Sequence, residues 1–363
     1  MIIIKFLVTL CSTYLIGYTL FSAIETLVLP RSLPNRISWA VSSFTRVVFN
    51  ILLKTQHTYP ARDRLMAFYA PINLLLLPPT WLLLILIGYS GIYWMLGVHS
   101  WYEAIQLSGS SLLTLGYAPP ANWPQTIIEF SQAAIGLLLV ALLISYLPTI
   151  YSAFSRRENA VTLLEVRAGN PPTALEMIAR FHRIHGLDRL SEQWKTWESW
   201  FADIDESHTS LPILAFFRSP QPEHSWIIAA GAVLDAASLT LSALDIPYDA
   251  SAALCIRGGY LALRHITQVF NIPTPTDPRF PDQPISVSRM EFDSVLNQLA
   301  SQGVPIRSDC DQAWRDFAGW RVNYDQSLIA LAKLTMAPQA PWTGDRTTDL
   351  FHPSPFFRRA RPI

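Results

Sequence analysis

The segment Trp101–Tyr117 has the sequence WYEAIQLSGSSLLTLGY and lies between two apolar stretches that are each long enough to cross a bilayer. It is short and amphipathic, as expected of a segment that enters a membrane and turns back. Inside a membrane, non-helical backbone is tolerated only where it is buried in protein or lines a water-filled cavity. The segment therefore predicts a pore between two membrane-spanning helices.

Thr114, Leu115, Gly116 and Tyr117 resemble the first four residues of the potassium-channel selectivity filter, TVGYG. The order of elements over about residues 66–154 is also similar to that of the pore-loop potassium channels, namely an outer helix, a pore helix, the filter and an inner helix. The resemblance is to the bacterial-like type with two transmembrane helices. It implies a homotetramer that conducts a monovalent cation, K⁺ above all, without a cofactor and without enzymatic activity.

The chemistry of such a filter explains the residue types. Backbone carbonyl groups replace the hydration shell of a cation where several chains meet on one axis. Gly116 permits the left-handed backbone that aims successive carbonyls inward, and the Thr114 hydroxyl would add the innermost ring. The resemblance implies that Tyr117 packs outward against the pore helix. Ala118 replaces the family's second glycine, and because left-handed backbone costs such a residue about 1–2 kcal/mol, we expect the outermost ring to be reoriented or absent, with weaker selectivity.

The neighbouring helices supply further candidates. The expected pore helix, about Trp101–Ser111, would direct its partially negative C-terminal end at the axis. Gly136 lies near the position of the hinge glycine of many family members, although close helix packing would also explain it. Pro148 would either bend the inner helix or mark its end. Glu129 is expected at the pore mouth, where a carboxylate concentrates cations.

The composition divides the chain into a membrane part and a soluble part. It has 363 residues, a formal net charge of zero and 15% charged residues, whereas soluble proteins have roughly 25%. Residues 1–155 contain only 7 of the 27 Lys and Arg and 4 of the 27 Asp and Glu. The neutral charge gives no reason to expect a nucleic-acid partner, and Cys11, Cys255 and Cys310 show no metal or disulfide spacing.

The basic residues predict the topology. Six Lys and Arg in residues 31–64, and Arg156 with Arg157 after the second span, place both flanks of the pore domain in the cytoplasm. We therefore expect a multi-pass protein of the cell membrane, of bacterial inner-membrane type. The first span ends near Leu96, and Pro78 and Pro79 either kink it or start its main helix. The second span covers about Ile127–Tyr151. Residues 1–30 form a further transmembrane helix or a signal peptide.

Five regions follow from this pattern: 1–30, the basic cytoplasmic or interfacial segment 31–64, the pore domain 65–155, a mainly helical cytoplasmic domain 156–336 and a loosely ordered tail 337–363. Ile37–Leu53 is either an interfacial helix or a helix packed on the soluble domain. Residues 272–284 are a proline-rich loop, and a last helical stretch covers about Ser308–Met336.

Within the soluble domain, Trp194, Trp197 and Trp200 have the three-residue spacing of a buried helix face. Trp226–Leu244 has the length of a span but carries Asp235 at its centre, which favours a buried helix in which this carboxylate needs a partner. No nucleotide-binding fingerprint identifies a regulator, and the absence of an arginine repeat argues against a voltage sensor.

Two other classes of function stay open. A membrane-anchored enzyme would use His182, His185 and Asp188 as a metal site, or an active site assembled from His208, Arg218, Asp235 and His265. None of these sets matches a known catalytic pattern. A non-conducting receptor or scaffold with a degenerate pore is the other alternative, because Ala118 departs from the filter sequence.

Overall fold

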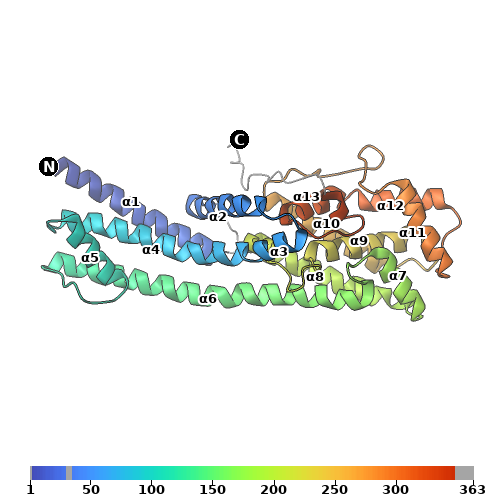
Figure 1. Ribbon diagram of the computed structural model, residues 1–363, viewed down its shortest axis with the longest axis horizontal. Helices are drawn as coiled ribbons and strands as arrows, with labels where there is room; N and C mark the ends of the chain where they lie inside the picture. Colours follow the sequence, from blue (N-terminus) through green and yellow to red (C-terminus); the bar gives the residue numbers. More distant parts are fainter. Residues whose placement is uncertain (1, 30–34, 348–363) are drawn as a thin grey trace. The chain divides into compact units, whose positions relative to one another are not determined.

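The computed structural model describes residues 2–29 and 35–347, and this part of the chain folds into α-helices and three short 3₁₀ helices (Figure 1). Its only strand-like pairing is a bridge between Leu244 and Ile306. The expected helical fold class is therefore confirmed. The chain divides into two compact units, Met1–Thr55 with Phe68–Ser152, and Gln56–Ala67 with Ala153–Ile363.

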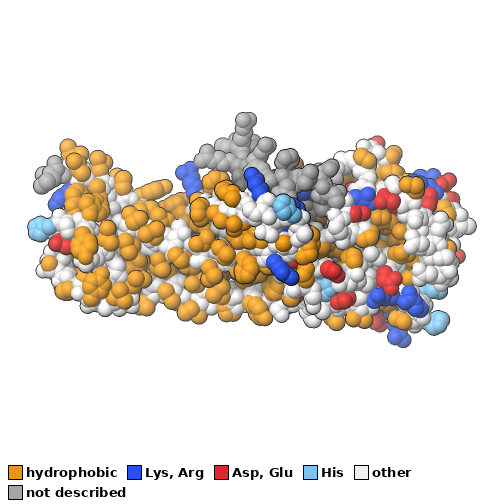
Figure 2. Space-filling model, viewed as in Figure 1, with side chains coloured by type: hydrophobic (Ala, Val, Ile, Leu, Met, Phe, Trp, Pro, Cys, Tyr) orange, Lys and Arg blue, Asp and Glu red, His pale blue; other side chains and the backbone are white. Residues whose placement is uncertain are grey.

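The first unit contains the most apolar helices. They are α1 (Ile2–Leu27), α2 (Arg36–Lys54), α4 (Tyr69–Met95), α5 (Trp101–Leu112) and the first part of α6 (Trp123–Ala168). Three stretches of the described chain are long and apolar enough to cross a membrane, namely Ile3–Leu27, Tyr59–Met95 and Trp123–Ala168. On the face shown in Figure 2, hydrophobic side chains predominate over α1, α4 and the first part of α6. These helices are those expected of a multi-pass membrane protein.

Small residues allow α1 and α4 to approach closely. A Cβ atom added to Gly91 of α4 would lie 2.1 Å from Ser12 Oγ, and one added to Gly88 would lie 2.7 Å from Ile16 Cγ1. Small residues at such contacts let two helix backbones pack together in a membrane. Pro78 and Pro79 lie inside α4 rather than at its start, so α1 packs along a helix that runs without interruption through both prolines.

The amphipathic helix α2 belongs to the first unit. One stripe of its side chains is buried, and the helix contacts α4 and α1. Its outer surface carries exposed apolar side chains, among them Phe44, Val47 and Ile51. The buried stripe of α2 is thus taken up within the first unit, whereas the choice between an interfacial helix and one that also packs on the soluble domain stays a prediction.

The second unit contains the shorter helices. They are α3 (Tyr59–Ala67), the end of α6, α7 (Ala174–Arg183), η1 (Leu187–Arg189), α8 (Leu190–Ser210), η2 (Pro212–Phe216), α9 (Trp226–Ser242), α10 (Ala250–Val269), α11 (Arg289–Ser301), α12 (Cys310–Arg321), α13 (Asp325–Thr335) and η3 (Gly344–Thr347). Charged side chains are conspicuous over α7, α11 and α12 in Figure 2.

The core of the second unit surrounds α9, in which every residue is buried. The expected buried helix is therefore confirmed, as is the core role of Trp194, Trp197 and Trp200, all of which are buried. The last helical stretch is divided into α12 and α13, and residues 272–284 contain no helix or strand.

The tail expected to be loose from residue 337 is partly built into this core. Ala340 and Trp342 are buried, and the Trp342 carbonyl accepts a hydrogen bond of 2.6 Å from Arg321 Nη2. The expectation of a loose tail is therefore wrong for this stretch, because an aromatic side chain and a carbonyl of the stretch complete the interior. Residues 348–363 of the expected tail lie outside the described residues.

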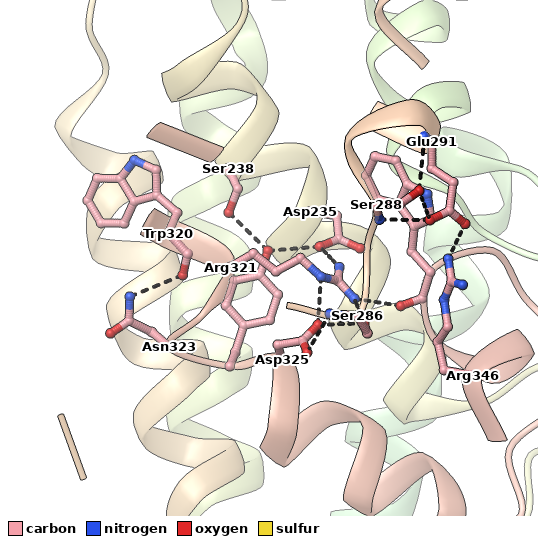
Figure 3. A network of polar contacts seen from close by, with 12 residues as sticks. Asp235, Ser238, Ser286, Ser288, Glu291, Trp320, Arg321, Asn323, Asp325 and Arg346 are labelled. Carbon is pink, nitrogen blue, oxygen red and sulfur yellow. Dashed lines mark hydrogen bonds and ion pairs between the residues drawn. The ribbon is translucent and has the colours of Figure 1, made fainter. Parts of the chain in front are cut away.

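Asp235 has the partner that its burial requires (Figure 3). Its carboxylate pairs with the Arg321 guanidinium and accepts a hydrogen bond of 2.8 Å from the Tyr324 hydroxyl. Arg321 Nε also donates to Asp325 Oδ1 at 2.8 Å. Burial raises the pKa of Asp235, and the Arg321 guanidinium opposes that rise. The network joins α9, α12 and α13, and each charge in it has an opposite charge as its neighbour.

Candidate functional site

Helix α5 folds back along α4 from the loop that joins the two. Its N-terminus is capped by Ser100, whose hydroxyl accepts a hydrogen bond of 3.2 Å from the Glu103 amide. Further along α5, the buried Ser108 hydroxyl donates to the carbonyl of Leu86 in α4 at 2.9 Å. Leu86 lies nine residues before the end of α4 at Met95, which corresponds to about 14 Å of helix. The C-terminal end of α5 therefore lies beside the middle of a bilayer-length helix.

Hydrogen bonds also fasten α5 to α6. Gln132 of α6 is fully buried, and its Nε2 atom donates to Ser108 Oγ at 2.7 Å. One turn further along α5, the Ser111 hydroxyl donates to the backbone carbonyl of Glu129 at 2.9 Å. Polar side chains commonly join helices in this way inside membranes. Ser108 thus links α4, α5 and α6 in one chain of hydrogen bonds.

Gly136 permits the closest contact between α5 and α6. A Cβ atom at this position would lie 2.3 Å from the carbonyl oxygen of Leu112, the last residue of α5. No side chain fits there unless α5 moves away. The structure thus gives Gly136 a packing role, and its role as a hinge stays a prediction.

The chain leaves α5 through a left-handed residue. The Thr114 amide donates to the Ser111 carbonyl at 3.0 Å, and the Leu115 amide donates to the Ser110 carbonyl at 2.8 Å. This pair of hydrogen bonds is the Schellman motif, in which glycine usually takes the left-handed position. Here Thr114 takes it with φ of 53°, which is rare for a β-branched residue. Its hydroxyl donates to the Leu113 carbonyl at 2.8 Å.

The backbone of Thr114–Tyr117 alternates in the sign of φ. Thr114 and Gly116 have φ of 53° and 69°, whereas Leu115 and Tyr117 are not among the residues with positive φ. Within residues 2–29 and 35–347, no hydrogen bond reaches the carbonyl oxygens of these four residues. Leu115 and Tyr117 are 61% and 58% exposed. The segment therefore presents a run of four unpaired carbonyl groups at the surface of the isolated chain.

The outer end of this segment is held by α5. The Tyr117 hydroxyl donates to the Gln106 carbonyl at 3.4 Å, and the Ala118 amide donates to Ser110 Oγ at 3.1 Å. Ala118 is not among the residues with positive φ. Ala118 thus avoids the strain of a left-handed alanine. The alternation in the sign of φ therefore ends at Tyr117, and the Ala118 carbonyl is not aimed by it.

Glu129 and Pro148 both lie inside α6. Glu129 is half-buried six residues after Trp123, or about 9 Å along the helix; its role at a pore mouth stays a prediction. Pro148 does not mark the helix end, because α6 continues for another twenty residues to Ala168. Since proline lacks an amide hydrogen, the Ile144 carbonyl loses its usual helical donor at this point.

The residues proposed for an enzyme site have separate partners. His265 Nδ1 contacts Asp205 at 2.8 Å, Arg218 pairs with Asp63, and Asp235 pairs with Arg321. His208 lies against Arg157, at 3.2 Å from its guanidinium. Among the residues that the structure describes, no group of three His, Cys, Asp or Glu is arranged to hold a metal ion. The structure thus does not bring these residues together as an active site.

The sequence did not single out Gln132, which holds α5 to α6. The sequence did contain a signal for Gln132, because an amide side chain in an apolar helix needs a hydrogen-bond partner from a neighbouring helix. In the sequence, Ser110 is one of the small residues suited to close packing beside the filter. Its hydrogen bond with the Ala118 amide could not be predicted, because that contact depends on how tightly the chain turns after α5.

The chain matches no protein-family model, no curated protein and no solved structure.

Proposed function

We propose that this chain is one subunit of a passive channel for monovalent cations, K⁺ above all, and that Thr114–Tyr117 line the ion path around an axis shared by four copies. The observation that carries the proposal is the run of four unpaired carbonyls on a backbone that alternates in the sign of φ. A carbonyl ring from each residue would replace water around a dehydrated cation. The other proposed roles are those expected from the sequence, namely filter for Ala118, gating for Gly136 and Pro148, and pore mouth for Glu129.

The depth of the segment supports this function. The end of α5 lies beside the middle of α4 and is fastened there through Ser108. A backbone carbonyl that faces hydrocarbon without a partner costs several kcal/mol. Four such groups beside the centre of a bilayer are tolerated only where they face water, ions or other copies of the chain. A subunit surrounded by lipid alone would be strongly disfavoured.

The exposed surface of α6 supports an assembly. Its window of highest hydropathy is only 17% buried within the chain, and Leu137, Leu138 and Ile144 are among its exposed apolar side chains. In a membrane, this surface contacts lipid on one side and neighbouring copies on the other. The second unit would then modulate conduction through α6, which continues into it; the stimulus it senses is a separate question.

The test is a flux assay on reconstituted protein in K⁺ and then in Na⁺. Gly116→Ala should abolish flux, because alanine disfavours the left-handed backbone by about 1–2 kcal/mol in every copy. Gly97→Ala is a matched control, since Gly97 also has positive φ and open space around its Cα atom but lies outside the carbonyl run. We expect it to conduct normally.

Selectivity is tested by Ala118→Gly. The added glycine allows a further left-handed residue at the outer end, so the variant should prefer K⁺ over Na⁺ more strongly than the natural chain. Normal flux in Gly116→Ala would contradict the proposed ion path. A natural chain that conducts neither ion would instead favour the receptor or scaffold.

A further inference from the structure

A buried arginine fastens the end of α6 to a short segment of the second unit. The Arg157 side chain is 1% exposed. Its guanidinium donates to the carbonyls of Leu214 and Phe217, at 2.7 and 2.8 Å, and to the Glu158 carboxylate at 2.8 Å. The Phe217 ring also packs on Phe154 of α6, with 5.5 Å between ring centroids. Both the backbone and the side chains of the segment thus contact α6.

The next residue of that segment holds a different helix. Arg218 pairs with Asp63 of α3 at 3.3 Å, and the two side chains are 12% and 8% exposed. Arg218 Nη1 also donates to the Met336 carbonyl at the end of α13, at 2.9 Å. Arginine at this position is favourable because the last carbonyls of a helix carry partial negative charge.

The helix held by Arg218 leads directly into α4. Between α3 and α4, Phe68 has φ of −84° and ψ of −15°, which lie in the helical region. Tyr59–Met95 accordingly forms one long apolar stretch. We call the segment Leu214–Arg218 the linking segment. It contacts α3, which leads into α4 before α5 in the sequence, and α6, which follows α5.

We infer that the linking segment mechanically couples the α3 end of the α3–α4 stretch to the end of α6, so that a displacement of one is passed to the other through the Asp63–Arg218 pair and the Arg157 hydrogen bonds. The coupling itself depends only on contacts within the second unit. Its consequence, control of ion passage by the second unit, rests on the proposed function. A regulator that shifts the linking segment would then move both helices together.

Contacts outside the linking segment also hold the end of α6 in the second unit. Arg156 pairs with Asp203 of α8 at 3.0 Å, and Glu165 lies 3.2 Å from His224 Nε2. Loss of the Asp63–Arg218 pair should therefore leave α6 in place and weaken the attachment of α3. The pair is accordingly the point at which the coupling is tested.

The experiment measures distances by electron paramagnetic resonance between spin labels in the full-length protein. Labels are attached at Arg64→Cys in α3 and Asn159→Cys in α6, both exposed positions of the second unit. Cys11→Ser and Cys310→Ser remove the exposed native thiols, whereas Cys255 is buried. This labelled protein is the parent for all variants.

Arg218→Gln and Asp63→Asn should each broaden the distance distribution at least about two-fold. The double variant should be no broader than either single one, because residues that act through one contact are not additive. Arg279→Gln is the matched control, since it removes an ion pair with Asp277 that is fully at the surface. It should leave the distribution unchanged.

Distributions as narrow as the parent in both single variants would overturn the coupling. Circular dichroism checks that each variant is folded, and Asp63→Asn decides the question if Arg218→Gln does not fold. Because the distances are read without ion flux, a broadened distribution in a protein that conducts no ion would retain the coupling and remove the proposed function.

Discussion

Replacing Gly136 by alanine should separate α5 from α6. The added Cβ atom would lie 2.3 Å from the Leu112 carbonyl oxygen, whereas a comfortable contact needs more than 3 Å, so α5 must move by about 1 Å. Overpacking of this kind costs about 1–3 kcal/mol. The movement also strains the Ser111–Glu129 and Gln132–Ser108 hydrogen bonds, which contribute about 0.5–1.5 kcal/mol each. We expect a loss of about 2–6 kcal/mol in the free energy of unfolding.

The assay is denaturant unfolding of purified protein in detergent, with Gly17→Ala as the control. Gly17 lies within α1 of the same unit and has open space around it, so alanine there should stabilise the helix by up to about 1 kcal/mol. If Gly136→Ala unfolds at the same denaturant concentration as Gly17→Ala, the packing argument is wrong. Unchanged stability with altered flux would instead favour a hinge at Gly136.

Three further outcomes are expected. Ser110→Ala removes the partner of the Ala118 amide, and reconstituted flux should then discriminate less between K⁺ and Na⁺. Burial, together with the nearby Arg157 charge, lowers the pKa of His208 well below 6.5. As the pH falls below 6.5, the unfolded chain therefore binds a proton at this histidine and the folded chain does not, which favours unfolding. Between pH 7.5 and pH 5, the melting temperature should fall more for the natural chain than for His208→Gln. Asp235→Asn leaves the Arg321 guanidinium without its nearest charge partner and should cost about 3–5 kcal/mol in denaturant unfolding.

The sequence predicted those elements whose physical signals are local. The length and hydropathy of the spans, the short helix that begins at Trp101 and the burial of the helix around Asp235 follow from composition and periodicity. It also predicted that Asp235 needs a partner, because an isolated buried charge is strongly unfavourable. Arg321 could not be named in advance, since 86 residues separate the pair.

Other features depend on contacts between distant segments. Along the continuation of α6 beyond Tyr151, the Arg157 side chain is buried in the interior of the second unit, although in the sequence it appears only as part of a basic flank. The short stretch around Trp342 appeared loose because it is rich in proline and polar residues, but its carbonyl completes the partners of Arg321. Such roles follow from packing that no local pattern encodes.

Helix termination alone does not explain why a threonine takes the left-handed position at residue 114. Glycine would satisfy the Schellman motif there without the strain of a β-branched residue, which is of the order of 1–3 kcal/mol. What threonine adds is a hydroxyl group, and among the described residues this group bonds to the preceding carbonyl alone. Around a shared axis, the same hydroxyl would contribute an oxygen next to the four unpaired carbonyls. The strain at Thr114 is thus accounted for if the segment works in an assembly, whereas helix capping alone leaves it unexplained.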